Sequence, residues 1–189
     1  MIRISFIAGE LAFTAVWLAV RIVGWIRRKK IDWKREAALL LMYVNLAVII
    51  RLVFYPFFTV GGKVQPLIFD PGKILPPRVN LVPFVHIAEY DSVREMMINI
   101  FGNIVMFIPG GIILPLIYRR LDGFFKVVVA SAGISAAVEI LQLLFYGSVT
   151  DIDDLILNTA GAAAGCGIYF LFRAASKAFR DRNKAENIL

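Results

Sequence analysis

Charged residues are scarce in this chain. They make up 19% of its 189 residues, against 59% hydrophobic residues, and the mean hydropathy is +0.74. A soluble domain needs a polar surface that such a composition does not supply. The sequence therefore indicates an integral membrane protein.

Cysteine and histidine are almost absent. Because Cys166 is the single cysteine, a disulfide within the chain and a zinc site built from cysteines are both excluded. Since Cys166 lies among small residues, we expect it to be a packing residue. The single histidine, His86, has no serine, cysteine or second histidine at a recognisable spacing, which argues against a nucleophilic catalytic triad.

Five apolar runs are long enough to cross a bilayer, and they predict an all-α, polytopic membrane helix bundle. These runs cover residues 4–26, 37–58, 98–118, 124–146 and 155–172. The first run is too long for a cleaved signal peptide and no small-residue cleavage site follows it, so we expect the first helix to be retained. The chain then divides into an N-terminal helix with a basic loop (1–36), a membrane domain (37–173) and a basic tail (174–189).

Lysine and arginine gather in three segments that a five-helix topology places on one side of the membrane. The segments are 27–35, 119–126 and 173–184. Since short basic loops are retained in the cytoplasm, we expect an N-terminus outside, a cytoplasmic C-terminus and a multi-pass protein of the cell membrane. The net charge of +7 then reflects topology and attraction to anionic membrane lipids, and no nucleic-acid motif competes with this interpretation.

The segment 59–97 would face outward. Its prolines and glycines disfavour helices and a continuous strand, so we predict an ordered loop. Asn80, Pro83 and Phe84 would form either a structural lid over a polar cavity between the helices, which is the favoured interpretation, or a tight turn that rests in the outer leaflet. The segment ends in the sequence SVRE, a capping box in which Ser92 would accept a hydrogen bond from the amide of Glu95.

One polar residue of each predicted helix falls at a similar depth. With a rise of ~1.5 Å per residue, these residues lie roughly 10 Å below the outer boundary. They are Glu10, Arg51, Asn103, Glu139 and Asn158. A charge facing lipid at this depth would cost about 2.5–3.5 kcal/mol, so we expect the side chains to turn inward and line a polar cavity that opens outward. A second ring nearer the surface is predicted from Asn99, Gln142 and Asp154.

Two stripes of polar and small residues should face each other, because residues three, four and seven apart share one side of a helix. On the fourth helix the stripe is Ser131, Ser135, Glu139, Gln142 and Tyr146. On the fifth it is Asp151, Asp154, Asn158, Gly161 and Gly165. The short turn between these helices predicts antiparallel neighbours. The Gly161-x-x-x-Gly165 spacing allows another backbone to approach closely.

The acidic run 151–154 has two interpretations. Either Thr150 or Asp151 would cap the fifth helix, with Asp153 and Asp154 interacting favourably with its N-terminal dipole. Alternatively, the three aspartates are oxygen ligands for Mg²⁺ or Ca²⁺, although their spacing is not that of an EF-hand. Beyond this metal alternative, the sequence predicts no cofactor.

Glu139 and Gln142 are candidates for ligand binding or proton transfer, and the alternative is a hydrogen-bonded pair that fixes helix packing. Arg51 is the natural partner of Glu10 or Glu139, yet it could equally hold a lipid phosphate. Hydrogen bonds across helices are the alternative role of Asn99, Asn103 and Asn158.

Four stretches between residues 78 and 167 carry a family resemblance. They are RVNLVPF, NIFGNIVMFIPGGIILPLI, EILQLLF and DIDDLILNTAGAAAG. In this order and spacing they resemble the VanZ-like membrane proteins, whose name comes from a component of teicoplanin resistance in Gram-positive bacteria. The resemblance implies a small cell-envelope protein, associated in some members with lowered glycopeptide susceptibility, and it supplies no mechanism. Family members often have a basic residue just before the Asp-x-Asp-Asp run, where this chain has GSVT, and this difference argues against phosphate binding at that position.

Three functions are consistent with these expectations. The first is binding or handling of an amphiphilic envelope molecule, such as a lipid-linked cell-wall precursor or a lipoglycopeptide, in the polar cavity. The second, which no motif supports, is an intramembrane enzyme that modifies a lipid head group with Glu139 or Asp154 as general base and Arg51 on a phosphate. The third is a structural partner protein without a ligand.

Overall fold

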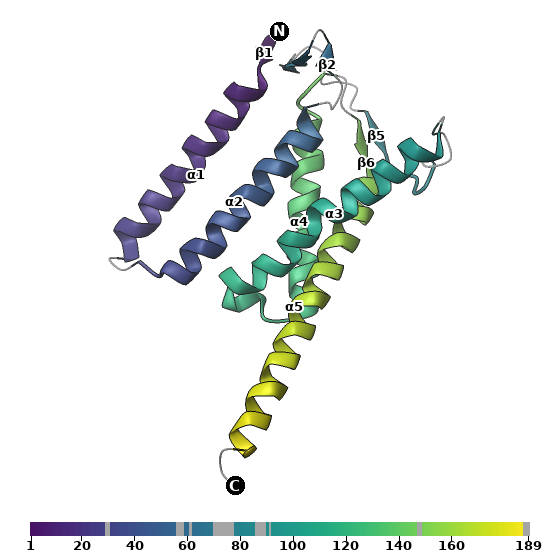
Figure 1. Cartoon of the computed structure of the whole chain (residues 1–189). Helices are drawn as coiled ribbons and strands as arrows, with labels where there is room; N and C mark the ends of the chain where they lie inside the picture. Colours follow the sequence, from purple (N-terminus) through teal and green to yellow (C-terminus); the bar gives the residue numbers. More distant parts are fainter. Residues whose placement is uncertain are drawn as a thin grey trace.

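Helices make up most of the chain (Figure 1). The computed structural model describes residues 1–28, 31–55, 59–60, 62–69, 78–85, 90, 92–146 and 149–186. Five helices in this part of the chain are long and apolar enough to cross a membrane. They are α1 (Phe6–Arg28), α2 (Trp33–Phe54), α3 (Val93–Ile117), α4 (Phe124–Gln142) and α5 (Ile152–Glu186). The predicted all-α, polytopic membrane bundle is confirmed.

The starts of three helices follow from side-chain caps. The carboxylate of Asp32 accepts hydrogen bonds from the backbone of Lys34 and Arg35, at 3.1 and 3.3 Å, before α2. Ser92 accepts from the amide of Glu95 at 3.2 Å before α3, as the SVRE sequence predicts. These caps satisfy backbone donors that the first turn of a helix leaves without a partner. The third cap, at α5, belongs to the site described below.

The ends of α4 and α5 differ from those of their apolar runs. α4 ends at Gln142, four residues before the end of the predicted run, because the chain turns there toward α5. α5 has 35 residues, which corresponds to a length of about 52 Å at 1.5 Å per residue. Since the hydrocarbon core of a bilayer is about 30 Å thick, the basic tail is a continuation of α5 beyond the core.

The segment 59–97, predicted as a loop, contains four short strands in its described part. They are β2 (Thr59–Val60), β3 (Lys63–Val64), β4 (Leu67–Phe69) and β5 (Val79–Asn80). β2 and β3 form an antiparallel pair. β4 pairs antiparallel with β1 (Ile2–Ile4) at the N-terminus, and β5 pairs parallel with β6 (Thr150–Asp151) just before α5. Strands of two or three residues are too short to give an alternating pattern, so the sequence does not reveal them.

α3 lies at the centre of the bundle, where it packs against α2, α4 and, most extensively, α5. A methyl group added at Gly161 would overlap the backbone oxygen of Ile104, and one added at Gly165 would overlap that of Ile108. The Gly161-x-x-x-Gly165 spacing therefore allows two backbones to approach closely, as predicted. The partner backbone is that of α3.

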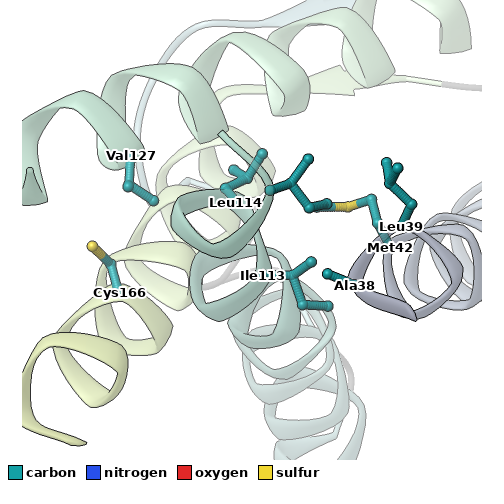
Figure 2. Packing of buried hydrophobic residues seen from close by; sticks show 8 residues of the cluster. Ala38, Leu39, Met42, Ile113, Leu114, Val127 and Cys166 are labelled. Carbon is teal, nitrogen blue, oxygen red and sulfur yellow. The ribbon is translucent and has the colours of Figure 1, made fainter. Parts of the chain in front are cut away.

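The apolar core joins four helices (Figure 2). It includes Ala38, Leu39 and Met42 of α2, Ile113 and Leu114 of α3, Val127 of α4 and Cys166 of α5. Cys166 is fully buried in this cluster, which agrees with its expected role as a packing residue.

α1 lies beside α2 at the edge of the bundle (Figure 1). The rings of Phe13 and Tyr43 stack with centroids 5.5 Å apart, and the hydroxyls of Thr14 and Tyr43 are 2.8 Å apart. Nearer the other end of α1, Arg21 forms an ion pair with Glu36 of α2. No residue of α1 is buried, so most of its apolar surface is left to contact lipid.

Candidate functional site

Glu139 lies in the last turn of α4, where the chain turns back toward α5. Its side chain is only 5% exposed, and its carboxylate accepts a hydrogen bond from the backbone N–H of Asp151 at 3.1 Å. The hydroxyl of Thr150 donates to the backbone oxygen of Glu139 at 2.8 Å. These two bonds hold β6 against the end of α4 and fix the carboxylate in place.

Gln142 is the nearest side-chain donor to Glu139 on α4. With its amide oriented to donate, the Gln142 nitrogen is 3.2 and 3.3 Å from the two carboxylate oxygens of Glu139. In this orientation Gln142 and Glu139 form the hydrogen-bonded pair that the sequence offers as the alternative to a ligand-binding or proton-transfer role. This pair is compatible with a ligand site, because a carboxylate can accept further hydrogen bonds.

Asp154 joins α5 to α3. Its carboxylate accepts a hydrogen bond from the side-chain amide of Asn103, which is 9% exposed. Glu139 and Asp154 are close enough to interact electrostatically. Neither carboxylate forms an ion pair with a lysine or arginine in the described part of the chain. Two neighbouring acids thus lie within apolar helices, held by neutral donors.

Asn158 lies one turn deeper than Asp154 and joins α5 to α4. Its amide nitrogen donates to the hydroxyl of Ser135 at 2.9 Å, and both residues are at most 1% exposed. Its amide oxygen is also buried, and it has no hydrogen-bond partner within the described ranges. The two predicted stripes therefore do face each other, and α4 and α5 are antiparallel neighbours.

Six residues from α3, α4, β6 and α5 are brought together in this way, and we refer to them as the polar site. They are Asn103, Glu139, Gln142, Asp151, Asp154 and Asn158. Asp151, Asp154 and Gln142 are partly exposed, whereas Glu139 and Asn158 are buried. A ligand entering from the surface would therefore meet the aspartates first.

Asp151 and Asp153 organise the entrance to α5. Asp151 accepts a hydrogen bond from the backbone N–H of Asp153 at 3.0 Å, so Asp151 caps the helix, as one of the two interpretations predicts. Asp153 is 4% exposed and accepts from the backbone N–H of Phe84 at 2.8 Å. The amide of Asn80 donates to Asp151 at 3.1 Å. Both aspartates thus attach the segment 78–85 to α5.

The described part of the chain does not support the interpretation of the three aspartates as metal ligands. No group of three histidine, cysteine, aspartate or glutamate side chains is placed there to hold a metal ion. One oxygen each of Asp151, Asp153 and Asp154 is instead used by hydrogen bonds from the protein.

Tyr90 lies beside the same acids. Burial, followed by the negative charges of Asp154, Asp151, Asp153 and Glu95, raises the pKa of its phenol above the ordinary value. Its hydroxyl therefore stays protonated and can donate a hydrogen bond near the entrance of the polar site. The sequence gives no signal for this placement, because Tyr90 is distant from the aspartates along the chain.

Arg51 and Glu10 lie elsewhere. Arg51 donates to the backbone oxygen of Tyr55 at 2.7 Å, and its guanidinium carbon is 5.3 Å from the centroid of the Phe6 ring. Glu10 is near the phenol of Tyr55, whose pKa is raised by burial and then by the charge of Glu10. In the described part of the chain, neither Glu10 nor Glu139 pairs with Arg51. The similar depth predicted for Glu10 and Arg51 therefore did not make them part of the polar site.

Three further residues show the limits of the sequence reasoning. Asn99 is half-buried and forms no hydrogen bond with the residues that the structure describes. Asn45 was missed: it is 7% exposed and donates to the backbone oxygen of Met106 at 2.9 Å, a role that its position inside an apolar run would have suggested. His86 lies outside the described residues.

Comparisons with known proteins place these motifs in a family. A family model described as VanZ/LLP1 matches residues 40–173. Protein VanZ of Enterococcus faecium is 33% identical over 93 residues, which are 49% of this chain and 53% of VanZ. The match thus spans about half the length of this curated relative. No solved structure matches the chain.

Proposed function

The chain belongs to the VanZ/LLP1 family, and from this premise we propose that it binds an amphiphilic molecule of the cell envelope, whose head group occupies the polar site. The candidate ligands are a lipid-linked cell-wall precursor and a lipoglycopeptide. The corresponding biological role would be altered susceptibility to glycopeptide antibiotics such as teicoplanin.

One observation carries this proposal: Glu139 and Asp154 belong to apolar helices, are close enough to interact electrostatically, and have no cationic partner in the described part of the chain. An unpaired carboxylate is costly in a membrane, and acids within spanning helices usually mark a functional site. The pair is also held in place, by the backbone of Asp151 and by the amide of Asn103.

The charge of the site favours a particular class of head group. Glu139, Asp151 and Asp154 would repel the phosphates of a lipid-linked precursor, so its sugar hydroxyls, or an ammonium group of the ligand, would occupy the polar site and supply the donors that carboxylates accept. The buried, unsatisfied oxygen of Asn158 is a further acceptor. We therefore expect a head group rich in hydrogen-bond donors, with its apolar part in the surrounding lipid.

The distribution of basic residues along the bundle supports an outward-facing site in the cell membrane. The end of α1, the start of α2, the start of α4 and the tail of α5 are rich in basic residues and lie at one end of the bundle, whereas β6 and the start of α5 lie at the other (Figure 1). By the positive-inside rule the basic end is cytoplasmic. The polar site would then face the outside, where envelope precursors and antibiotics are found.

The enzyme alternative has less support from the geometry. It places Arg51 on a phosphate beside Glu139 or Asp154, but the described contacts of Arg51 are with Tyr55 and Phe6. The remaining alternative, a structural protein without a ligand, is separated from ligand binding by the experiment below.

Native mass spectrometry of the protein, released gently from its own membranes, tests the proposal. We expect a bound amphiphile with wild type and with Glu10→Gln, a control that neutralises a glutamate of α1 away from the polar site. Glu139→Gln and Asp154→Asn keep the size of the side chain but remove its charge, and we expect the amphiphile to be lost from the double variant. Equal occupancy in all variants would place the ligand elsewhere, and a wild type without any ligand would favour the structural role.

A further inference from the structure

The turn at residues 81–85 exposes an unusual group of apolar side chains. Leu81 is 70% exposed, Val82 60%, Phe84 56% and Val85 40%. These residues follow β5 and lie beside the N-terminus of α5, to which the turn is attached. Water is a poor solvent for such a cluster, because exposed apolar side chains gain from contact with an apolar phase.

The backbone of this turn is strained at Phe84. Its φ angle is +66°, and it is the single non-glycine residue with a positive φ in the described part of the chain. Phe84 follows Pro83, and a position with positive φ after proline in a turn is usually occupied by glycine. A bulky residue persists in this conformation only when the surroundings enforce it, and such positions cluster at functional sites.

Hydrogen bonds to α5 enforce the conformation. The N–H of Phe84 donates to the buried carboxylate of Asp153 at 2.8 Å. Asn80 binds the backbone N–H of Val82 at 3.1 Å through its oxygen and Asp151 at 3.1 Å through its nitrogen. The turn is thus fixed at the start of α5, while its apolar side chains remain exposed.

The position of the turn along the bundle indicates whether it can reach lipid. Asp153 and Asp154 are in the first turn of α5, and Asp154 is bonded to Asn103, ten residues into α3. Two and five residues before Asn103, α3 exposes Phe101 and Ile98, at 53% and 60%. These two side chains belong to a helix that is apolar enough to span the membrane, so the same level is within reach of lipid.

We propose that residues 81–85 form a membrane-inserted turn, in which Phe84 and its neighbours contact the acyl chains of the surrounding bilayer at the rim of the polar site. Strain at Phe84 is tolerated because the aromatic ring is needed in lipid, where glycine would offer no side chain. The bilayer would then reach the entrance of the polar site from the side, without passing through water. This inference stands on the turn alone and holds whatever the polar site binds.

An environment-sensitive NBD fluorophore on a single introduced cysteine tests the insertion. Val82→Cys places the label on the turn and Lys63→Cys places it on the exposed β3 as a control, while the fully buried native Cys166 serves as the unreacted background. In nanodiscs of phosphatidylglycerol and phosphatidylethanolamine, we expect blue-shifted emission at position 82, quenching by lipids spin-labelled near the top of the acyl chain, and protection from iodide. Position 63 should show the reverse.

A second variant keeps the proposal falsifiable if labelling disturbs the turn. Phe84→Gly relieves the backbone strain and removes the ring, so we expect a higher melting temperature in detergent, together with a loss of at least half of the lipid quenching at position 82. Water-like emission and iodide quenching at position 82 equal to those at position 63 would overturn the proposal. So would unchanged lipid quenching in Phe84→Gly, because the ring would then not anchor the turn.

Discussion

Replacing Gly161 by alanine tests how the polar site is held together. At this position the backbones of α5 and α3 are in contact, and an added methyl group would overlap the backbone oxygen of Ile104. This oxygen is part of the helix and cannot move aside as a flexible side chain can. The two helices must therefore separate, or α5 must shift.

The size of the effect follows from two opposing terms. Overpacking costs about 1–3 kcal/mol, and contact with a backbone atom places Gly161→Ala near the upper end. Replacing glycine by alanine within a helix contributes roughly 1 kcal/mol in the other direction, so the net loss is about 2 kcal/mol. Gly167→Ala is the matched control on the same helix, because nothing lies within 4 Å of a methyl group added there; it should gain roughly 1 kcal/mol.

Thermal unfolding of the two purified variants in the same detergent measures the difference. The variants should differ by about 3 kcal/mol, or roughly 6–12 °C in melting temperature for a chain of this size. Because Asp154 and Asn103 meet two turns before Gly161 on the same interface, ligand retention by Gly161→Ala should fall as well. A Gly161→Ala protein that melts at or above Gly167→Ala would refute the packing of α3 on α5.

Other predictions concern single contacts. Glu36→Gln breaks the ion pair with Arg21, whose side chains are only 12% and 17% exposed. We expect thermal unfolding to show a loss of about 1–3 kcal/mol, which is less than a fully buried pair would cost. Arg173→Ala is the control: it breaks the exposed pair with Asp122 and should not measurably change the melting temperature. Asn45→Ala removes a buried hydrogen bond between α2 and α3 and should lower the free energy of unfolding by about 1 kcal/mol. Asn99→Ala removes no such bond and should have a smaller effect. Equal losses in the two variants would contradict the assigned hydrogen bond of Asn45. Because carboxylates repel a phenolate, Asp154→Asn should lower the raised pKa of Tyr90; an ultraviolet titration read as the difference from Tyr90→Phe checks this, and an unchanged pKa would place Tyr90 away from Asp154.

Much of the local structure was predictable from the sequence. The five spanning helices follow from apolar runs, and the cap at Ser92 follows from the SVRE sequence. The contact between the stripes of α4 and α5 also follows, because helical spacing fixes which residues share a face and a short turn makes the helices neighbours. All of these depend on residues close together in the chain.

Pairings over long distances were not predictable in the same way. β5 binds β6 across about seventy residues, and Asn80 and Phe84 reach the aspartates of α5 over a similar distance. The sequence suggested a turn near Asn80 and a cap at Asp151 but gave no reason to join them. Strands of two residues carry too little pattern to indicate a partner.

The sequence by itself determined the solvent and the helices, and it predicts a depth for each polar residue, because hydropathy and a constant rise per residue are properties of a single segment. Only the tertiary structure decided which residues at one depth are neighbours. It brought Asn103, Glu139 and Asn158 into one site and left Glu10 and Arg51 near Tyr55. The physical reason is that depth is measured along a helix, whereas proximity depends on how helices pack side by side, which long-range contacts such as Gly161 on Ile104 establish.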